Sequence, residues 1–443
     1  MRSAEQGARP MLNGNIENFG YGLLGPYLVD FCIWLRMRKQ ELDGDACLLF
    51  LARDGYLIQK IYRILFPEDA EVAHYVLASR ATNRYAELET EEKILKFYSS
   101  LAKANQESEA LLTIYRFLGQ PRLLRPQSPP PAPNTKGRFS RTDSEECRWP
   151  EGIKDLLPHI IARSEQYRSE YRRYLDATLA SRYPIVVDIG YRAKTQQFFS
   201  KLLNTPVGGF YLVTHKSAKK VARESGPITA FDAGFIAPDS SESFVNRHRY
   251  FFEVILSEQR GTFHYFDKDS SPVYDDFVSD PRSRTIGLAI ERGVMRYAMY
   301  FRRLGNPQDA LIEARDKLKA FLDSPHADDA VLFTGLTFDD RFNGITQRYV
   351  VIPPAERQQK FALWVQGQQA IDVKCRSTPM ANANPGFCRK VEIIIMDRLL
   401  TRAHFACYMS NRSLYTKQNG GVFYLLFSAF KGFIKRAIHA SHG

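Results

Sequence analysis

The stretch that decides the fold is CLLFLARDGYLIQKIYRILF, residues 47–66. An apolar run reaches Leu51-Ala52, and apolar residues then recur at helical spacing from Leu57 onward. This pattern predicts a buried strand followed directly by a helix. Arg53, Asp54 and Gly55 occupy the junction, so two opposite charges and a glycine stand where the strand ends.

A second junction of the same kind lies in VVDIGYRAKTQQ, residues 186–197, where Asp188 and Gly190 separate a strand from a helix. Ligands of parallel sheets bind outside the carboxyl ends of the strands, and the free N–H groups of a helix start attract phosphate. A glycine at such a place often only makes a turn, and an aspartate often only caps the helix. Two charged junctions in one chain favour a phosphosugar site.

Further strand patterns occur in AHYVLAS (73–79), GGFYLVTH (208–215) and ITAFDAGFIA (228–237), the last expected at a sheet edge. They alternate with helical patterns, which predicts an α/β fold with a mostly parallel sheet and helices on both faces. From residue 241 on, the patterns are mainly helical, at 242–257, 283–304, 307–322 and 355–370.

Two domains are expected, a catalytic domain over 15–270 and a mainly helical C-terminal lobe over 271–443. Residues 120–152 are rich in proline, serine and charge and are predicted to be an insertion or mobile loop within the first domain. Residues 421–439 form a basic amphipathic pattern. Such a helix either lies in a membrane interface or packs on the domain, and the sequence favours neither.

The formal net charge is +12, which favours an anionic partner, although a solvated basic surface would have the same composition. None of the six cysteines has CxxC or zinc-ligand spacing, so reduced thiols and a cytoplasmic protein are expected. The start lacks the pattern of a signal peptide, and no uncharged apolar run reaches transmembrane length. Neither a G-x-x-x-x-G-K-[ST] loop nor a G-x-G-x-x-G fingerprint occurs, which argues against an ATPase or an NAD enzyme.

Five stretches in order resemble one family of bacterial surface-polysaccharide proteins, over about residues 15 to 267 without the proline-rich insert. They are ENFGYGLLGPYLVDFCIWL, LLFLARDGYLIQKIY, YVLASRA, VVDIGYRAKTQ and FFEVILSEQRGTFHYFD. The matched part of that family has a phosphoribosyltransferase-like (Rossmann-like) fold, and members are described as pentofuranosyltransferases of O-antigen and capsule synthesis. They transfer 5-phosphoribofuranose from phosphoribosyl pyrophosphate, and a HAD-type phosphatase then removes the phosphate.

The resemblance implies a role for each junction. Arg53, Asp54 and Gly55 would hold pyrophosphate and Mg²⁺, and Asp188 would hold the ribose hydroxyls. Catalytic roles are expected for Asp188, Arg53 and Asp54, with Asp54 and Asp188 binding the metal, directly or through waters. The remaining expected donor-binding residues are Tyr56, Arg80, Gly190, Tyr191, Arg192, Ala193, Lys194, Thr195 and Gln196, with Gly190–Thr195 around the 5-phosphate.

The chain departs from the family at Ala193-Lys194, where a Gly-Thr pair is usual, and this leaves the donor sugar phosphate open. It also lacks a D-x-D-x-[TV] motif, so the phosphatase is expected on a separate chain. No general base stands out, and Asp54 and Glu253 are the candidates.

The leading hypothesis is a phosphoribosyl pyrophosphate-dependent glycosyltransferase acting on a lipid-linked or polysaccharide acceptor, at the inner face of the cytoplasmic membrane. Nucleic acid is not an expected partner. Two alternatives stay open: a glycosyltransferase that uses a nucleotide sugar, and a non-catalytic binding protein of the same fold at the membrane.

Overall fold

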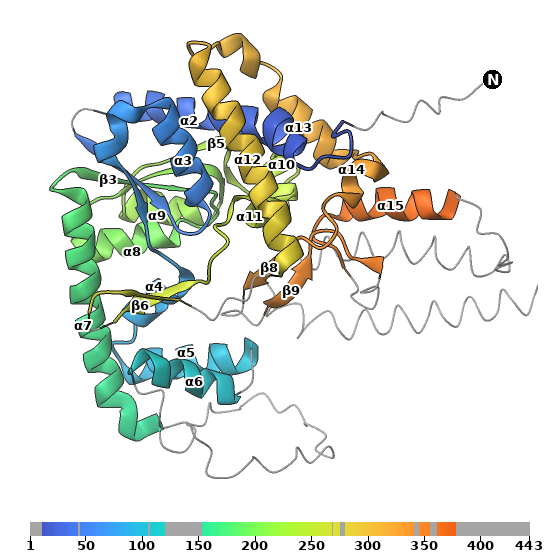
Figure 1. Cartoon of the computed structure of the whole chain (residues 1–443). Coiled ribbons are helices and arrows are strands. Elements are labelled where there is room, and N and C mark those ends of the chain that lie inside the picture. The colour runs from blue at the N-terminus through green and yellow to red at the C-terminus, as the bar shows by residue number, and fades with distance from the viewer. Residues whose placement is uncertain are drawn as a thin grey trace, which may run out of the picture.

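A five-stranded parallel sheet, in the order β2-β1-β3-β4-β5, forms the centre of the molecule (Figure 1). The strands are β1 (Ala46–Leu51), β2 (Ala73–Val76), β3 (Tyr183–Asp188), β4 (Gly208–His215) and β5 (Ile228–Ile236). This confirms the expected α/β class and the edge position of 228–236. The computed structural model describes residues 11–42, 45–104, 107–119, 153–267, 269–274, 280–340, 345–354 and 361–377.

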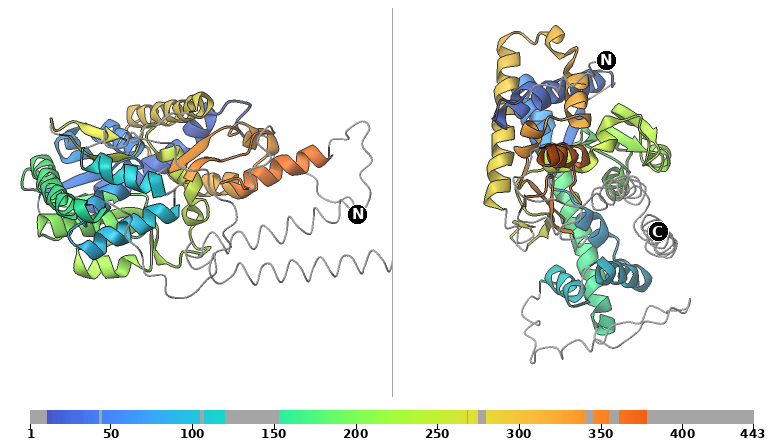
Figure 2. Two further views of the ribbon diagram at one scale, coloured as in Figure 1. Left: turned by 90° about the horizontal axis from the view of Figure 1, so that it is seen from below. Right: turned by 90° about the vertical axis from the view of Figure 1, so that its right-hand side faces the viewer.

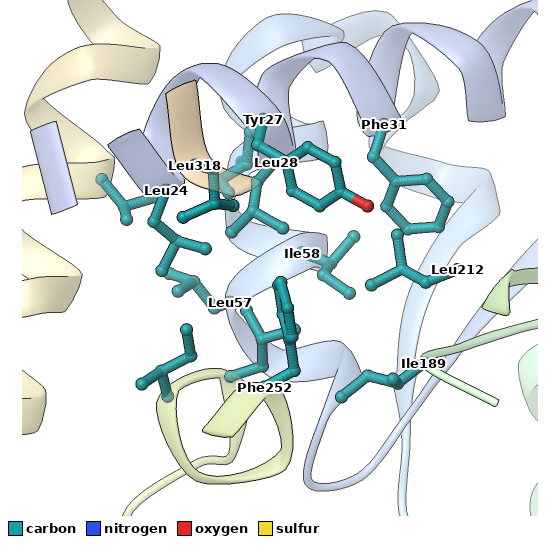
Figure 3. Close-up of a cluster of buried hydrophobic side chains, with 14 of the residues drawn as sticks. Leu24, Tyr27, Leu28, Phe31, Leu57, Ile58, Ile189, Leu212, Phe252 and Leu318 are labelled. Carbon is teal, nitrogen blue, oxygen red and sulfur yellow. The ribbon is translucent and has the colours of Figure 1, made fainter. Parts of the chain in front are cut away.

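One face of the sheet packs against the N-terminal helices and their neighbours (Figure 3). Alternate strand residues such as Leu48, Phe50 and Leu212 point to this face and are fully buried. Burying each such side chain stabilises the fold by about 1.5–3 kcal/mol. The covering elements are α1 (Glu17–Phe19), the π-helical turn η1 (Gly20–Leu24), α2 (Gly25–Gln40), α3 (Gly55–Leu65), α10 (Phe244–Arg247), α11 (Arg249–Leu256) and α12 (Pro281–Arg303).

The opposite face buries the other set of strand residues, among them Leu49, Val186 and Tyr211. It is covered by α4 (Arg80–Ala86), α5 (Glu91–Ala104), α6 (Glu107–Phe117), α7 (Ile153–Leu179), α8 (Lys194–Leu203) and α9 (Ala218–Glu224). The antiparallel pair β6 (Phe263–Phe266) and β7 (Pro272–Tyr274) closes this side. A 3₁₀ turn, η2 (Pro67–Val72), joins α3 to β2.

The chain after residue 280 adds to the first of these cores. It contains η4 (Gln308–Leu311), α13 (Ala314–Asp323), α14 (Ala327–Val331), the hairpin β8 (Thr337–Asp340) and β9 (Ile345–Tyr349), and α15 (Val365–Ser377). Buried residues of α12 and α13 and Trp364 belong to the same cluster as α2 and α3. The domain boundary near residue 270 stays a prediction.

Two of the segments singled out in the sequence, 120–152 and 421–439, lie outside the described residues. Within the described ranges, no helix combines the length and the apolar character needed to cross a membrane.

Two glycines, Gly20 and Gly293, allow α12 to lie directly against α1 and η1. Helix α12 lies on the outside of the helices that cover this face of the sheet (Figure 2). A Cβ on Gly293 would lie 2.1 Å from the carbonyl oxygen of Glu17 and 3.0 Å from Cα of Gly20. A Cβ on Gly20 would lie 2.1 Å from the carbonyl oxygen of Ile290. The two backbones therefore touch, and no larger residue fits at either position.

Gly293→Ala is expected to destabilise the protein by about 1–3 kcal/mol, because the added methyl group forces two backbones apart. The matched control is Gly287→Ala in the same helix, where a Cβ meets only the flexible Gln259 side chain, at 3.2 Å. That control should be neutral or stabilising by up to about 1 kcal/mol, since alanine favours the helix. Urea unfolding of both variants measures the difference, and equal stabilities would contradict the close crossing.

Candidate functional site

The two charged turns follow neighbouring strands at the same edge of the sheet. Strands β1 and β3 pair in parallel, with Phe50 opposite Val187, so Asp188 continues this register beside the end of β1. The chain leaves β1 toward β2 on one side and reaches β3 on the other, so the topological switch point lies between these two strands. Open α/β sheets bind ligands in the crevice at this point.

The turn after β1 is held by the segment that follows α11. Ser257 Oγ donates a hydrogen bond to Asp54 Oδ1 at 2.6 Å, and the Glu258 backbone N–H donates to the Arg53 carbonyl oxygen at 3.1 Å. The Arg53 guanidinium donates in turn to the Arg260 carbonyl oxygen at 3.3 Å. Three contacts between segments more than 200 residues apart thus fix where both charges of the turn lie.

Gly55 starts α3 and packs directly on β1. A Cβ at this position would lie 2.8 Å from the backbone carbon of Phe50. The neighbouring Tyr56 accepts a hydrogen bond from Lys60 Nζ at 3.0 Å and packs edge-on against Tyr75. Packing therefore explains why a glycine occupies position 55, and it brings Tyr56 beside the end of β2.

Acidic groups gather around Asp188. Burial raises the pKa of the Asp188 carboxyl well above its usual value, and the nearby negative charges of Asp54 and Glu253 raise it further. A hydrogen bond from the Ile189 N–H to Asp188 Oδ1, at 2.9 Å, and the positive charge of Arg80 lower the same pKa. Two further carboxyl groups and an arginine, from three other elements, thus act electrostatically on Asp188 at the switch point, a combination typical of functional sites.

The turn after β3 requires its glycine. Gly190 has φ +150°, and a Cβ there would lie 2.1 Å from the Val213 carbonyl oxygen. Ala193 also adopts a left-handed conformation, φ 53°, directly before α8 begins at Lys194. The backbone thus reverses sharply, and α8 starts with its N–H groups at the same sheet edge as Asp188.

The structure separates the remaining expected residues into two groups. Arg80, Arg192 and Lys194 are exposed, and Thr195 is partly buried in the first turn of α8. Gln196 differs, because its side chain is fully buried and points into the fold. Its Nε2 donates to the carbonyl oxygens of Val207 (2.7 Å) and Gly226 (3.1 Å), and its Oε1 accepts from Tyr211 at 2.9 Å. Gln196 therefore holds α8 to the sheet, whereas the sequence predicted a ligand contact.

Helix α11 places further charged groups near the site, of which the sequence had singled out Glu253 but neither Arg249 nor Ser257. Arg249 and Glu253 are four residues apart, so they lie on one helix face, and Ser257 follows directly after the helix. The charges of Glu253, Arg249 and Asp54 all act on the Tyr191 hydroxyl, whose pKa is raised mainly by burial. The spacing R-x-x-x-E-x-x-x-S was the available signal, but only the fold indicates what this face meets.

The carboxylates suit a magnesium ion that is shared with a ligand rather than one held by protein alone. Among the described residues, no group of three or more His, Cys, Asp or Glu side chains has the spacing of a metal cage. Mg²⁺ is usually bound through one or two carboxylates together with waters and substrate phosphates. Such a cation would neutralise the negative charges of Asp54 and Asp188, which otherwise repel each other.

Asp188→Asn is expected to raise the melting temperature at pH 7 by roughly 1–3 °C. The folded-state pKa of Asp188 is raised, so the charged carboxylate costs stability once the pH rises above the carboxyl's unfolded-state pKa. The gain should therefore vanish at acidic pH, where the wild-type carboxyl is protonated. Thermal unfolding at several pH values measures it.

Asp323→Asn is the control with opposite sign. Asp323 accepts from His248 (2.8 Å) and pairs with Arg247 (2.9 Å) and Lys319 (3.0 Å), and these contacts lower its pKa. A lowered carboxyl pKa gives stability that is present at neutral pH and lost on acidification, so this variant should melt lower at pH 7. A lower melting temperature for both variants would mean that Asp188 is a structural charge.

Comparison with known proteins assigns no family to the chain. No protein-family model matches it, and no curated protein is significantly similar to it in sequence. The function is therefore inferred from the site.

Proposed function

We propose that the protein transfers 5-phosphoribofuranose from phosphoribosyl pyrophosphate to a sugar hydroxyl of a bacterial surface glycan and releases pyrophosphate. The observation that carries this proposal is the pair of charged turns, Arg53-Asp54-Gly55 and Asp188-Ile189-Gly190, on either side of the topological switch point. A donor with phosphate at both ends needs two phosphate-binding turns with a hydroxyl-binding group between them. The resemblance noted in the sequence points to the same donor.

Asp188 has the chemistry to bind the ribose hydroxyls. Its Oδ1 accepts one hydrogen bond from Ile189 N–H, and its second oxygen accepts none from the described residues. A carboxylate oxygen accepts hydrogen bonds from sugar hydroxyls, and in the ligand complex it would offset the positive charge that develops on the ribose ring.

The phosphate ends of the donor would be bound by the two turns. Arg53 offers a guanidinium beside Asp54, and Arg80 starts α4 next to the same crevice, so both suit the pyrophosphate group. The start of α8, from Ala193 to Thr195, offers backbone N–H groups to the 5-phosphate. Lys194 adds a positive charge at this end, although its Nζ also donates to Gln197 Oε1 at 3.0 Å.

Asp54 and Asp188 would hold Mg²⁺, which supplies positive charge to the departing pyrophosphate. The remaining work belongs to protein groups that position the ribose and exclude water. Ser257 keeps Asp54 oriented through the 2.6 Å hydrogen bond between their side chains. A phosphatase on a separate chain would then remove the 5-phosphate, and contact with a membrane through 421–439 remains part of the proposal.

Calorimetry should detect binding of phosphoribosyl pyrophosphate in the presence of Mg²⁺, and chelation of the metal should weaken it. With a panel of alkyl glycosides as acceptors, pyrophosphate release should accompany a phosphopentose mass increment. Asp188→Asn is expected to lower transfer by about 10²-fold or more, because a group facing the developing charge is lost.

The matched control is Asp176→Asn, an exposed carboxylate of α7 that pairs with Arg172 at 3.5 Å and should leave transfer unchanged. UDP and other nucleoside diphosphates, added as competitors, test the nucleotide-sugar alternative. If the protein binds a nucleotide but not phosphoribosyl pyrophosphate, the donor is a nucleotide sugar and the proposed donor is wrong. Donor binding without turnover on any acceptor would favour the non-catalytic alternative.

A further inference from the structure

A partly buried tyrosine and a buried histidine lie side by side next to the proposed donor site. Tyr191 follows β3, and His215 is the last residue of β4. Their rings stack with centroids 5.0 Å apart and an angle of 27° between the planes. The His215 backbone N–H also donates to the Tyr191 carbonyl oxygen at 2.8 Å, so the two residues are held together at the carboxyl ends of adjacent strands.

The tautomer of His215 follows from the contacts of Asn246. The Asn246 Nδ2 group donates to the carbonyl oxygens of Pro238 (3.1 Å) and Ser240 (3.2 Å), which fixes the orientation of the amide. Its Oδ1 therefore faces His215 Nε2, at 2.9 Å. Because an amide oxygen can only accept, Nε2 carries the hydrogen and Nδ1 of the neutral ring is a bare acceptor.

Two polar atoms of this pair are left without a partner. His215 Nδ1 and the Tyr191 hydroxyl are both buried, and neither makes a hydrogen bond to any described residue. His215 as a whole is 4% exposed. A buried polar atom without a partner destabilises the protein, and a bound ligand that hydrogen-bonds to both atoms would relieve this cost.

The surroundings keep the imidazole neutral and connect it to the site. Burial lowers the pKa of His215, the hydrogen bond to Asn246 raises it, and the positive charges of Arg249 and Arg192 lower it. Tyr191 in turn lies within the electrostatic reach of Glu253, Arg249 and Asp54. A neutral acceptor at the end of β4 and a hydroxyl donor in the turn that follows β3 are thus both within the electrostatic reach of charges on α11.

We propose that Tyr191 and His215 form the subsite for the attacking hydroxyl of the acceptor sugar, with His215 Nδ1 taking its proton. This assignment rests on the proposed function. It makes His215 the general base, in place of the two candidates from the sequence, Asp54 and Glu253. Both atoms are shielded from solvent, so acceptor binding has to move the Tyr191 ring, whose hydroxyl is anchored to none of the described residues.

The proposed step balances. The acceptor O–H bond breaks, and its proton passes to His215 Nδ1. The oxygen forms a bond to the anomeric carbon of the ribose, while the bond from that carbon to pyrophosphate breaks and its electron pair leaves with the pyrophosphate. The imidazolium then returns its proton to water.

Two variants test the subsite. His215→Gln keeps an N–H that can reach Asn246 but removes Nδ1, and Tyr191→Phe removes only the hydroxyl. His215→Gln should bind phosphoribosyl pyrophosphate with Mg²⁺ within about twofold of wild type. Transfer to alkyl glycosides should fall by about 10²-fold or more in His215→Gln, the range of a lost general base, and by a smaller factor in Tyr191→Phe.

The pH dependence of transfer distinguishes a catalytic role of His215 from a purely structural one. Wild-type transfer should fall at acidic pH as Nδ1 becomes protonated, and this limb should be absent from His215→Gln. The matched control is Tyr27→Phe, which removes another buried hydroxyl that has no partner among the described residues, on α2 in the core. It should leave donor binding and transfer unchanged.

The outcomes distinguish the two proposals. Wild-type transfer rates in both subsite variants, or an acidic limb that persists in His215→Gln, would overturn the subsite while leaving the donor site intact. Failure of the wild-type protein to bind phosphoribosyl pyrophosphate would overturn the proposed function, and the subsite with it. Normal donor binding with lost transfer and a lost acidic limb would support both.

Discussion

The parallel pairing of β1 with β3 is the constraint on which the rest of the site depends. It brings residues 50 and 187 to the same level of the sheet, although 136 residues separate them in the chain. Since both strands run in the same direction, their charged turns must emerge at the same edge. Strand β2 lies on the other side of β1, so the topological switch point of the sheet falls between the two turns.

Charge repulsion at this edge is tolerated because the surrounding structure holds it in place. Asp54 and Asp188 raise the cost of each other's ionisation, and Glu253 adds a third negative group. The hydrogen bond from Ser257 to Asp54 and the contact between Arg53 and Arg260 hold the turn after β1 in place. Asp54 therefore stays near Asp188 despite the repulsion between them. A site arranged in this way gains stability when a cation or a cationic transition state is present.

The helices after β5 do more than cover the sheet. Helix α11 packs its apolar residues Phe251, Phe252 and Val254 into the core. The charges of Arg249 and Glu253, on the same helix, act on Tyr191, and the charge of Glu253 also acts on Asp188. Helix α12 then locks the N-terminal turn through the Gly20–Gly293 crossing. The position of the charged groups of α11 therefore depends on packing contributed by both ends of the described chain.

The amino-acid sequence by itself determined the strands, the two charged turns and the α/β class, because these depend on local patterns. Apolar runs, a glycine and a helical repeat within 20 residues are enough to locate a strand end such as Arg53-Asp54. It also marked Asp188 and Gly190 as members of a second turn. The insert at 120–152 and the basic helix at 421–439 remain predictions from sequence, outside the described residues.

Only the tertiary structure decided which side chains meet. Gln196 has the same sequence neighbourhood as Thr195, yet three contacts with β4 and the loops beside it turn its side chain into the core. His215 ends an apolar strand like an ordinary boundary residue, and its tautomer follows from an asparagine 31 positions later. Hydrogen-bond geometry and burial depend on distances between remote segments, and the order of residues along the chain does not contain these distances.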